Sequence, residues 1–140
     1  MVGTGIYTLN VAAKHADAVN FAWSQSPEFF RERYRVLENH CKCMDRDLQE
    51  IRRSAGLMIL LAQTQTEINE KLMDHKRNRG SEYLQYLRRQ PPNLVGTPDI
   101  IAEKISEYLS YDIDHFILRW HFGDELESIK LFKDKVMNKI

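Results

Sequence analysis

A continuous apolar segment in the middle of the chain constrains the fold more than any other feature. Residues 57–62 read LMILLA and lie between Gly56 and the polar pair Gln63 and Thr64. An unbroken apolar run with polar boundaries is typical of a strand that is covered on both faces. Such strands occur in parallel sheets flanked by helices, so this segment predicts an α/β fold with a central parallel strand.

Two further β-prone segments, residues 18–21 and residues 116–120, lie before and after the central strand along the chain. Between them, apolar residues recur at steps of three and four, which predicts amphipathic helices. Parallel neighbours need a long connection, and a helix of this length provides a right-handed crossover. The sequence therefore predicts three successive β/α units, preceded by a short helix, in a single domain that spans residues 1–140.

Three of the helices have recognisable starts. Residues 26–28 (Ser-Pro-Glu) supply an N-cap hydroxyl, a proline at the first helical position and an acid that the helix dipole favours. Residues 97–99 (Thr-Pro-Asp) repeat this pattern. Thr64 and Glu67 have the spacing of a capping box.

The stretch from residue 78 to residue 95 is less regular. It is charged and aromatic, and it ends near Pro91 and Pro92, which interrupt regular helix. We therefore expect a helical turn around residues 82–88 and then a connecting loop.

Three units are too few to close a barrel. A complete eight-unit β/α barrel takes about 250 residues, whereas this chain has 140. Three strands would leave unpaired backbone groups along both edges of the sheet. We expect a partial TIM-barrel-like fold whose edges are covered in a homo-oligomer or by a companion chain that supplies the missing strands.

Charge and hydropathy argue against two classes of partner. Twenty basic residues balance twenty acidic ones, so no net charge attracts nucleic acid or an anionic membrane. The longest apolar run, residues 57–62, is far shorter than the roughly 18 residues of a membrane span. We expect a soluble cytoplasmic protein with no nucleic-acid or membrane partner.

His40, Cys41 and Cys43 are close enough in sequence to raise the question of a metal site. Structural metal sites of this kind normally have four ligands at characteristic spacing, and no second pair is present in the sequence. Residues two apart on a helix point in different directions, so the two cysteines are also poorly placed to pair. We expect reduced thiols, packed in a helix, and no metal.

Four segments of the chain occur in a recognisable order. They are residues 8–21 (TLNVAAKHADAVNF), 26–28 (SPE), 95–104 (VGTPDIIAEK) and 114–118 (DHFIL). Each segment alone is a weak signal, but four with compatible spacing are hard to obtain by chance. In this order they resemble the C-terminal part of the bacterial luciferase-like monooxygenases and their deazaflavin-dependent relatives, and the similarity spans nearly the whole chain.

This resemblance implies a flavin- or deazaflavin-dependent oxidoreductase barrel. In that family the reduced cofactor, FMN or a deazaflavin coenzyme, passes electrons to oxygen or hydride to a small organic substrate. The family's first half, which supplies much of the substrate pocket, has no counterpart in this sequence, so catalysis by this chain alone is in question. The alternative is a noncatalytic oligomeric structural or interaction module derived from the same fold.

Gly3, Thr4 and Gly5 form a candidate phosphate-binding turn. Glycines at a helix start can present free backbone N–H groups to a phosphate, a position that the helix dipole favours, and Thr4 adds a hydroxyl. The resemblance points to the family's phosphate-binding turn at the same place. The alternative is a frayed chain end.

Further candidates lie where strands end, because active sites of β/α barrels form at the carboxyl ends of the strands. Arg119 can pair with a phosphate or carboxylate, His121 can donate a hydrogen bond, and Trp23 or Trp120 can stack on a ring. The alternative for the same residues is a salt bridge, a loop contact or core packing, which needs no convergent geometry. We take Arg119, His121 and Trp23 as candidate cofactor-binding residues, and no catalytic residue is identified.

Overall fold

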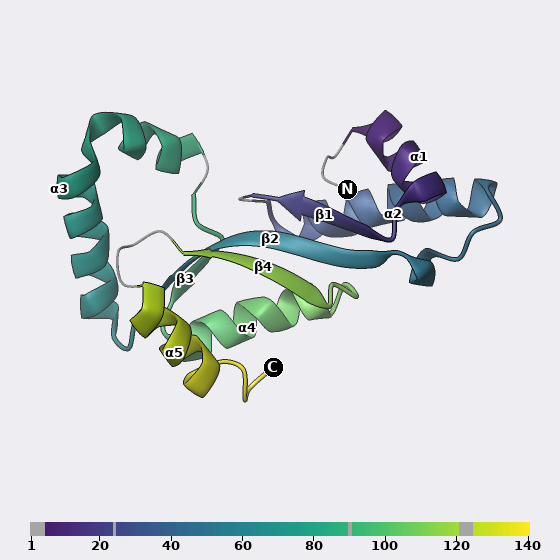
Figure 1. Cartoon of the computed structure of the whole chain (residues 1–140). Coiled ribbons are helices and arrows are strands. Elements are labelled where there is room, and N and C mark those ends of the chain that lie inside the picture. The colour runs from purple at the N-terminus through teal and green to yellow at the C-terminus, as the bar shows by residue number, and fades with distance from the viewer. Residues whose placement is uncertain (1–4, 24, 90, 121–124) are drawn as a thin grey trace.

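The structure is a computed structural model, and it describes residues 5–23, 25–89, 91–120 and 125–140. Helices and strands alternate along the chain (Figure 1). In order, the elements are α1 (Ile6–His15), β1 (Ala18–Ala22), α2 (Pro27–Cys43), a 3₁₀ turn (Leu48–Glu50), β2 (Arg52–Leu61), α3 (Gln65–Arg89), β3 (Leu94–Gly96), α4 (Pro98–Leu109), β4 (His115–Trp120) and α5 (Glu125–Lys135).

β2 is the centre of a parallel sheet. β1 pairs with residues 52–56 of β2, and β4 pairs with residues 54–59. Ser54 has a partner in both strands, so β1 and β4 lie on opposite edges of β2. The order β1, β2, β4 is that of three successive parallel β/α units, which confirms the predicted fold class.

β3 is a further strand, and it lies in the stretch expected to be a connecting loop. Its three residues pair with residues 59–61 of β2. Ile59 has partners in both β3 and β4, so β3 lies on the same edge of β2 as β1, beyond the point where β1 ends. A strand of three residues is too short to show a periodicity in sequence.

The bounds of two other elements also differ from prediction. α3 is continuous to Arg89, so the separate helical turn expected around residues 82–88 is part of this helix. β2 begins at Arg52, before the apolar run, because its first residues pair with β1 although their side chains are polar or small.

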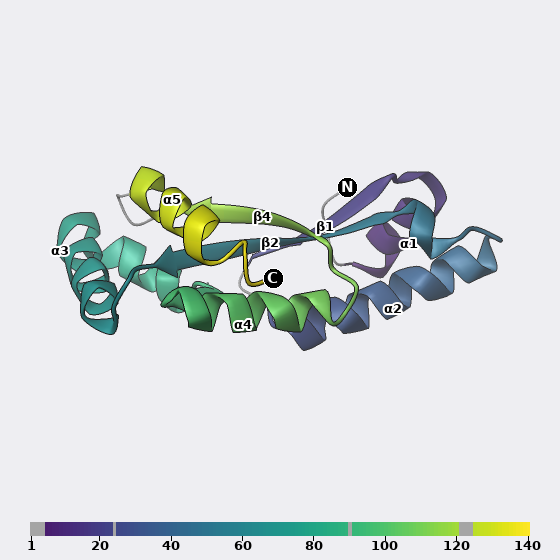
Figure 2. The same cartoon turned by 90° about the horizontal axis from the view of Figure 1, so that it is seen from below.

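The apolar run is buried on both faces, as predicted. Each residue from 57 to 62 is at most 1% exposed. Leu57, Ile59 and Leu61 pack in the main core with the aromatic residues of α2 and α4, whereas Leu60 packs in a second cluster with Ile68 of α3. Figure 2 shows α2 and α4 lying along one side of the sheet.

Two of the three predicted helix starts form their capping hydrogen bonds. The Phe29 N–H donates to Ser26 Oγ over 3.3 Å. The Glu67 N–H donates to Thr64 Oγ1 over 3.2 Å, and the Glu67 carboxylate accepts the N–H of Gln63. Both helices therefore start where their sequences predict.

The third start depends on close packing instead of a cap. α4 begins at Pro98, as expected, but the side chain of Thr97 makes no capping hydrogen bond. Gly96 has a φ of 157°, and a Cβ placed on it would lie 2.6 Å from Ile100 Cγ2. Only glycine leaves room for the helix to turn back directly over the strand.

The guanidinium of Arg46 fixes the C-terminal end of α1. Its Nη1 donates to the carbonyl of Ala13 and its Nη2 to the carbonyl of Ala16, each over 2.8 Å. The last carbonyls of a helix have no partner within the helix and carry partial negative charge. Arg46, whose side chain is 18% exposed, therefore caps α1 from the loop before β2.

Within the part of the chain that the structure describes, no helix is both long enough and apolar enough to cross a membrane.

We predict that Arg46→Ala lowers the free energy of unfolding by about 1–3 kcal/mol, because it leaves half-buried helix carbonyls without donors. Urea denaturation followed by circular dichroism measures this. The matched control is Arg35→Ala, which removes an exposed arginine of α2. An equal loss in both variants would contradict the capping role.

Candidate functional site

The predicted site lies at the carboxyl ends of the parallel strands. β1 ends at Ala22, β2 at Leu61 and β4 at Trp120. Because all pairs are parallel, these ends lie toward the same end of the sheet. We call this end the rim.

Two predicted residues, Trp23 and Arg119, meet at the rim. The guanidinium carbon of Arg119 lies 5.6 Å from the centroid of the Trp23 ring, and both residues are half-buried. This distance is within the range of a cation–π interaction. Trp23 follows β1 and Arg119 belongs to β4, so the contact spans the width of β2.

The register of the sheet decides which face carries this pair. Arg119 is in register with Met58, and Leu118 is in register with Leu57. Leu57 and Leu118 belong to the core beneath the helices. Successive side chains of a strand alternate between faces, so Arg119 lies on the opposite face, which becomes the interior in a closed barrel.

The other predicted residues have three different outcomes. Gly3, Thr4 and His121 lie outside the described residues, so their roles stay predictions. Gly5 is the exposed N-cap of α1, and its predicted role in cofactor binding stays a prediction. Trp120, the alternative stacking residue, packs edge-to-face on Phe132 of α5, with 5.9 Å between the ring centroids.

A hydrogen-bonded bridge from Asn93 supports the loop that carries Trp23. Asn93 Oδ1 accepts the backbone N–H of Met58 over 3.1 Å, and its Nδ2 donates to the carbonyl of Gln25 over 2.9 Å. The hydroxyl of Tyr108 donates to the same carbonyl over 3.0 Å. The bridge fills the gap on the edge of β2 between the end of β1 and the start of β3.

Sequence reasoning missed Asn93 and Tyr108. Asn93 and Gln25 are 68 residues apart in sequence, and no periodicity or motif connects them. The available signal is that Asn93 follows two prolines and directly precedes a strand, where a side-chain amide can replace a backbone partner.

The carboxyl end of β2 is held by two helices. The carbonyl of Leu61 accepts a hydrogen bond from Lys71 Nζ of α3 over 3.1 Å and another from Ser128 Oγ of α5 over 3.4 Å. Both helices follow strands of the sheet. Side chains from the second turn of α3 and the first turn of α5 therefore fix both helices to the rim.

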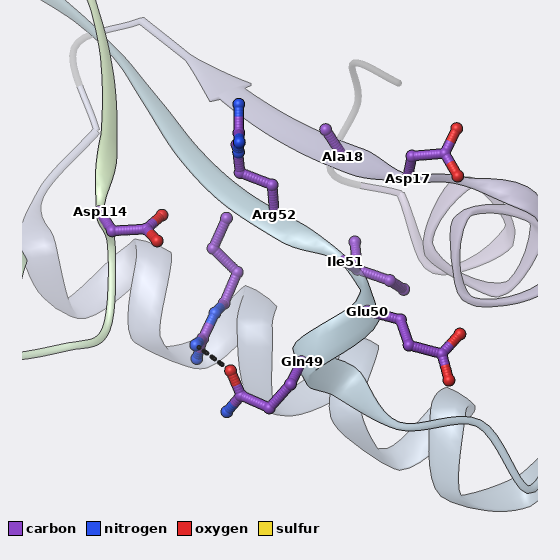
Figure 3. A pocket seen from close by; sticks show the side chains of 8 residues that line it. Asp17, Ala18, Gln49, Glu50, Ile51, Arg52 and Asp114 are labelled. Carbon is purple, nitrogen blue, oxygen red and sulfur yellow. Dashed lines mark hydrogen bonds between the residues drawn. The ribbon is translucent and has the colours of Figure 1, made fainter.

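A pocket of about 440 Å³ lies at the opposite end of the sheet (Figure 3). Both acidic and basic side chains line it, among them Asp17, Arg52, Arg53 and Asp114. Arg53 donates to Gln49 Oε1 over 3.2 Å, a bond that Figure 3 shows. This pocket lies at the amino ends of the strands. In β/α barrels that end contributes to stability, whereas active sites form at the carboxyl ends. The pocket therefore does not overlap the predicted site.

The two cysteines differ in environment. Cys41 is buried on α2 and Cys43 is exposed. Burial raises the pKa of the Cys41 thiol, which keeps it protonated and unreactive near neutral pH.

His40 Nδ1 lies 3.3 Å from the Asn10 side chain of α1. Among the described residues, no group of three or more His, Cys, Asp or Glu side chains is placed to hold a metal ion.

We predict that Asn93→Leu lowers the free energy of unfolding by about 1–3 kcal/mol, because it leaves the Met58 N–H without its acceptor. Urea denaturation measures the loss, and the emission of Trp23 in a Trp120→Phe background reports the change in the rim loop. Asn138→Leu is the control, since Asn138 is exposed and its amide donates to the nearby carbonyl of Asp134. Unchanged Trp23 emission would show that Asn93 does not position this loop.

Burial also raises the pKa of Tyr108 to about 12. Between pH 10 and pH 12 the folded protein therefore keeps the phenol protonated, whereas the unfolded chain releases the proton. The protonated phenol contributes its full stabilisation below pH 10, and this stabilisation is lost as the pH rises toward 12. Burial raises the pKa of Tyr34 as well. Both groups should make the protein less stable at alkaline pH.

We predict that Tyr108→Phe shows a smaller loss of stability between pH 8 and pH 11 than the unmodified protein does. The free energy of unfolding at the two pH values gives the comparison. The control is Tyr7→Phe, because Tyr7 is 86% exposed. A steeper pH dependence in Tyr108→Phe would mean that the phenol is not the group that titrates.

The chain is similar in fold to several solved enzyme structures. A coenzyme F420-dependent tetrahydromethanopterin reductase from Methanopyrus kandleri matches with a TM-score of 0.72 and 18% identity, over 99% of this chain and 49% of the reductase. A long-chain alkane monooxygenase matches with a TM-score of 0.73 and 18% identity, over 99% and 39%. A riboflavin lyase solved with modified FMN and riboflavin matches with a TM-score of 0.71 and 14% identity, over 98% and 41%.

No protein-family model and no curated protein sequence matches the chain. The three solved structures belong to the luciferase-like family that the sequence resembles. At these identities the similarity establishes the fold, and the chain spans less than half of each of these proteins. The chain thus has the fold of part of a luciferase-like TIM barrel, with a sheet that is not closed among the described residues.

Proposed function

We propose that this chain is the C-terminal, cofactor-binding part of a flavin- or deazaflavin-dependent oxidoreductase. The observation that carries the proposal is the fold: 99% of the chain matches less than half of a coenzyme F420-dependent reductase. The order of the four sequence segments supports the same assignment. FMN or a deazaflavin would supply the electron or hydride transfer when bound.

The rim has the chemistry that such a cofactor needs. Flavins and deazaflavins combine a flat ring system with an anionic tail. Trp23 offers an aromatic plane, and Arg119 beside it offers a guanidinium that binds phosphate or carboxylate through paired N–H groups. In the proposal, these two side chains orient the cofactor, and His121 adds a hydrogen bond.

The start of α1 would receive the phosphate. Gly5 is the N-cap of this helix, and Gly3 and Thr4 precede it. Helix N-termini bind anions because their first N–H groups have no partner and the dipole is positive there. The turn and the Trp23 and Arg119 pair would hold opposite ends of the cofactor.

Turnover is proposed only for the completed barrel. The solved enzymes are more than twice as long as the part that this chain matches. The missing units would supply the rest of the pocket for a small organic substrate. In this proposal the chain binds and orients the cofactor, and its partner completes the site.

A noncatalytic interaction module is the second candidate. It is favoured by β1 and β4, whose outer edges pair with no other strand in the described part of the chain. Such a module would associate through these edges and would bind no flavin.

Titration with FMN and with coenzyme F420 tests the cofactor assignment. In a Trp120→Phe variant, Trp23 is the one remaining tryptophan of the two in the sequence. We predict saturable quenching of its emission by at least one of the two cofactors. Arg119→Gln in this background should weaken binding by about tenfold or more, the effect of losing one charged hydrogen bond.

The matched control is Arg52→Gln, an exposed arginine at the amino end of β2 that should leave the affinity unchanged. If neither cofactor binds saturably, the cofactor assignment fails. If binding occurs but is equally weakened by both arginine variants, the site is not at the rim.

A further inference from the structure

We propose that a second pocket at the amino end of the sheet binds a small phosphate monoester. This pocket has a volume of about 320 Å³ and lies between α2, the first residues of β2 and the turn that joins α4 to β4. We call it the arginine pocket, because Arg31, Arg35 and Arg53 line it. It is separate from the rim, so the proposal does not depend on flavin binding and the two can fail independently.

The three arginines come from two elements. Arg31 and Arg35 are four residues apart on α2, and Arg53 is the second residue of β2. Residues at this spacing on a helix share a face, and like charges there destabilise the helix. The pair on α2 therefore lowers the stability of its helix unless an anion neutralises it.

The two carboxylates that line the arginine pocket already have cationic partners. Glu38 pairs with Lys42 of the same helix over 2.7 Å, and Asp112 pairs with Arg53 Nη1 over 3.4 Å. The hydrogen bond and the charge of Lys42 lower the pKa of Glu38, which keeps this carboxylate ionised and paired.

Arg31 and Arg35 are left without such a partner. Among the described residues, no carboxylate forms an ion pair with either guanidinium. Because Arg53 and Lys42 are neutralised, the arginine pocket carries the two positive charges of this pair. An anionic ligand is the remaining way to neutralise them.

Two contacts hold the walls of the arginine pocket in place. The side chain of Arg53 is 14% exposed, and its Nη2 donates to Gln49 Oε1. The guanidinium carbon of Arg31 lies 5.3 Å from the centroid of the Tyr111 ring, which is within the range of a cation–π interaction. Tyr111 belongs to the turn before β4, which Figure 2 shows near α2. Side chains that are already placed lose less freedom when a ligand binds.

Charge and size favour a phosphate monoester as the ligand. Near neutral pH such a group carries close to two negative charges and three acceptor oxygens. Two unpaired guanidiniums match it, because each can donate paired N–H groups to a phosphate. A carboxylate brings one charge and two oxygens. Leu48 and Tyr111, both half-buried, offer apolar surface to the ester group, and the volume of the pocket suits a small molecule.

The neighbouring pocket of Figure 3 has the opposite balance of charge. Arg53 borders both pockets, but in that one the acidic side chains Asp17, Glu50 and Asp114 outnumber the basic ones. Its carboxylates would repel a phosphate. The proposal therefore concerns the arginine pocket alone.

Titration of the 140-residue chain with phenyl phosphate, followed by the NMR shifts of its backbone amides, tests the proposal. We expect saturable shifts around Arg31, Arg35 and Tyr111. Benzoate has the same ring with a carboxylate and should bind about tenfold more weakly or less. Absence of saturable binding, or shifts at the rim without shifts at the arginine pocket, would overturn the proposal. Equal binding of the two compounds would overturn the assignment to phosphate.

Substitutions on α2 locate the site. Arg31→Gln and Arg35→Gln should each weaken the binding of phenyl phosphate by about tenfold or more, the effect of losing one charged hydrogen-bonding group. Circular dichroism checks that both variants fold, as expected for exposed residues. Arg52→Gln is the matched control, because Arg52 is exposed and lines the other pocket. Equal weakening by all three substitutions would overturn the proposal, since binding would then follow net charge and not this pocket.

Discussion

Burial of β2 on both faces is the constraint on which the other parts of this structure depend. Its apolar residues can leave water only if helices cover one face and further side chains cover the other. β1 and β4 provide the lateral hydrogen bonds, and their crossover helices provide the covering layer. Because the strands are parallel, their carboxyl ends must gather at one end of the sheet, and the rim is a direct result.

The central strand, the helix starts and the three-unit order could be predicted from sequence because each depends on neighbouring residues. Ser26 and Thr64 cap their helices through partners three positions away, and residues 57–62 reveal their burial by composition alone. β3 was not predictable, because three residues carry no period. The helix start at residues 97–99 was predicted correctly, but the predicted capping by Thr97 does not form. The close approach of Ile100 to Gly96 determines this start instead.

The sequence could predict which residues lie near the site, but not which of their side chains meet. The rule that barrel sites lie at carboxyl ends named Trp23 and Arg119, but the same rule named Trp120, which packs on Phe132. The difference comes from register, which sets the face on which each side chain lies, and sequence does not supply register here. Asn93 was beyond reach because its partners, Met58 and Gln25, are distant along the chain.

The cap that Arg46 places on α1 has a mechanical consequence. α1 joins β1 through two residues, Ala16 and Asp17, and it ends in extended backbone without the glycine turn that many helices use. The guanidinium therefore fixes the end of α1 that adjoins β1, and Leu9, Ala12 and Ala13 hold the helix against the core. The other end of α1, ten residues or about 15 Å away, is the N-cap Gly5. The position of the proposed phosphate-binding turn therefore depends on side chains at the amino end of the sheet.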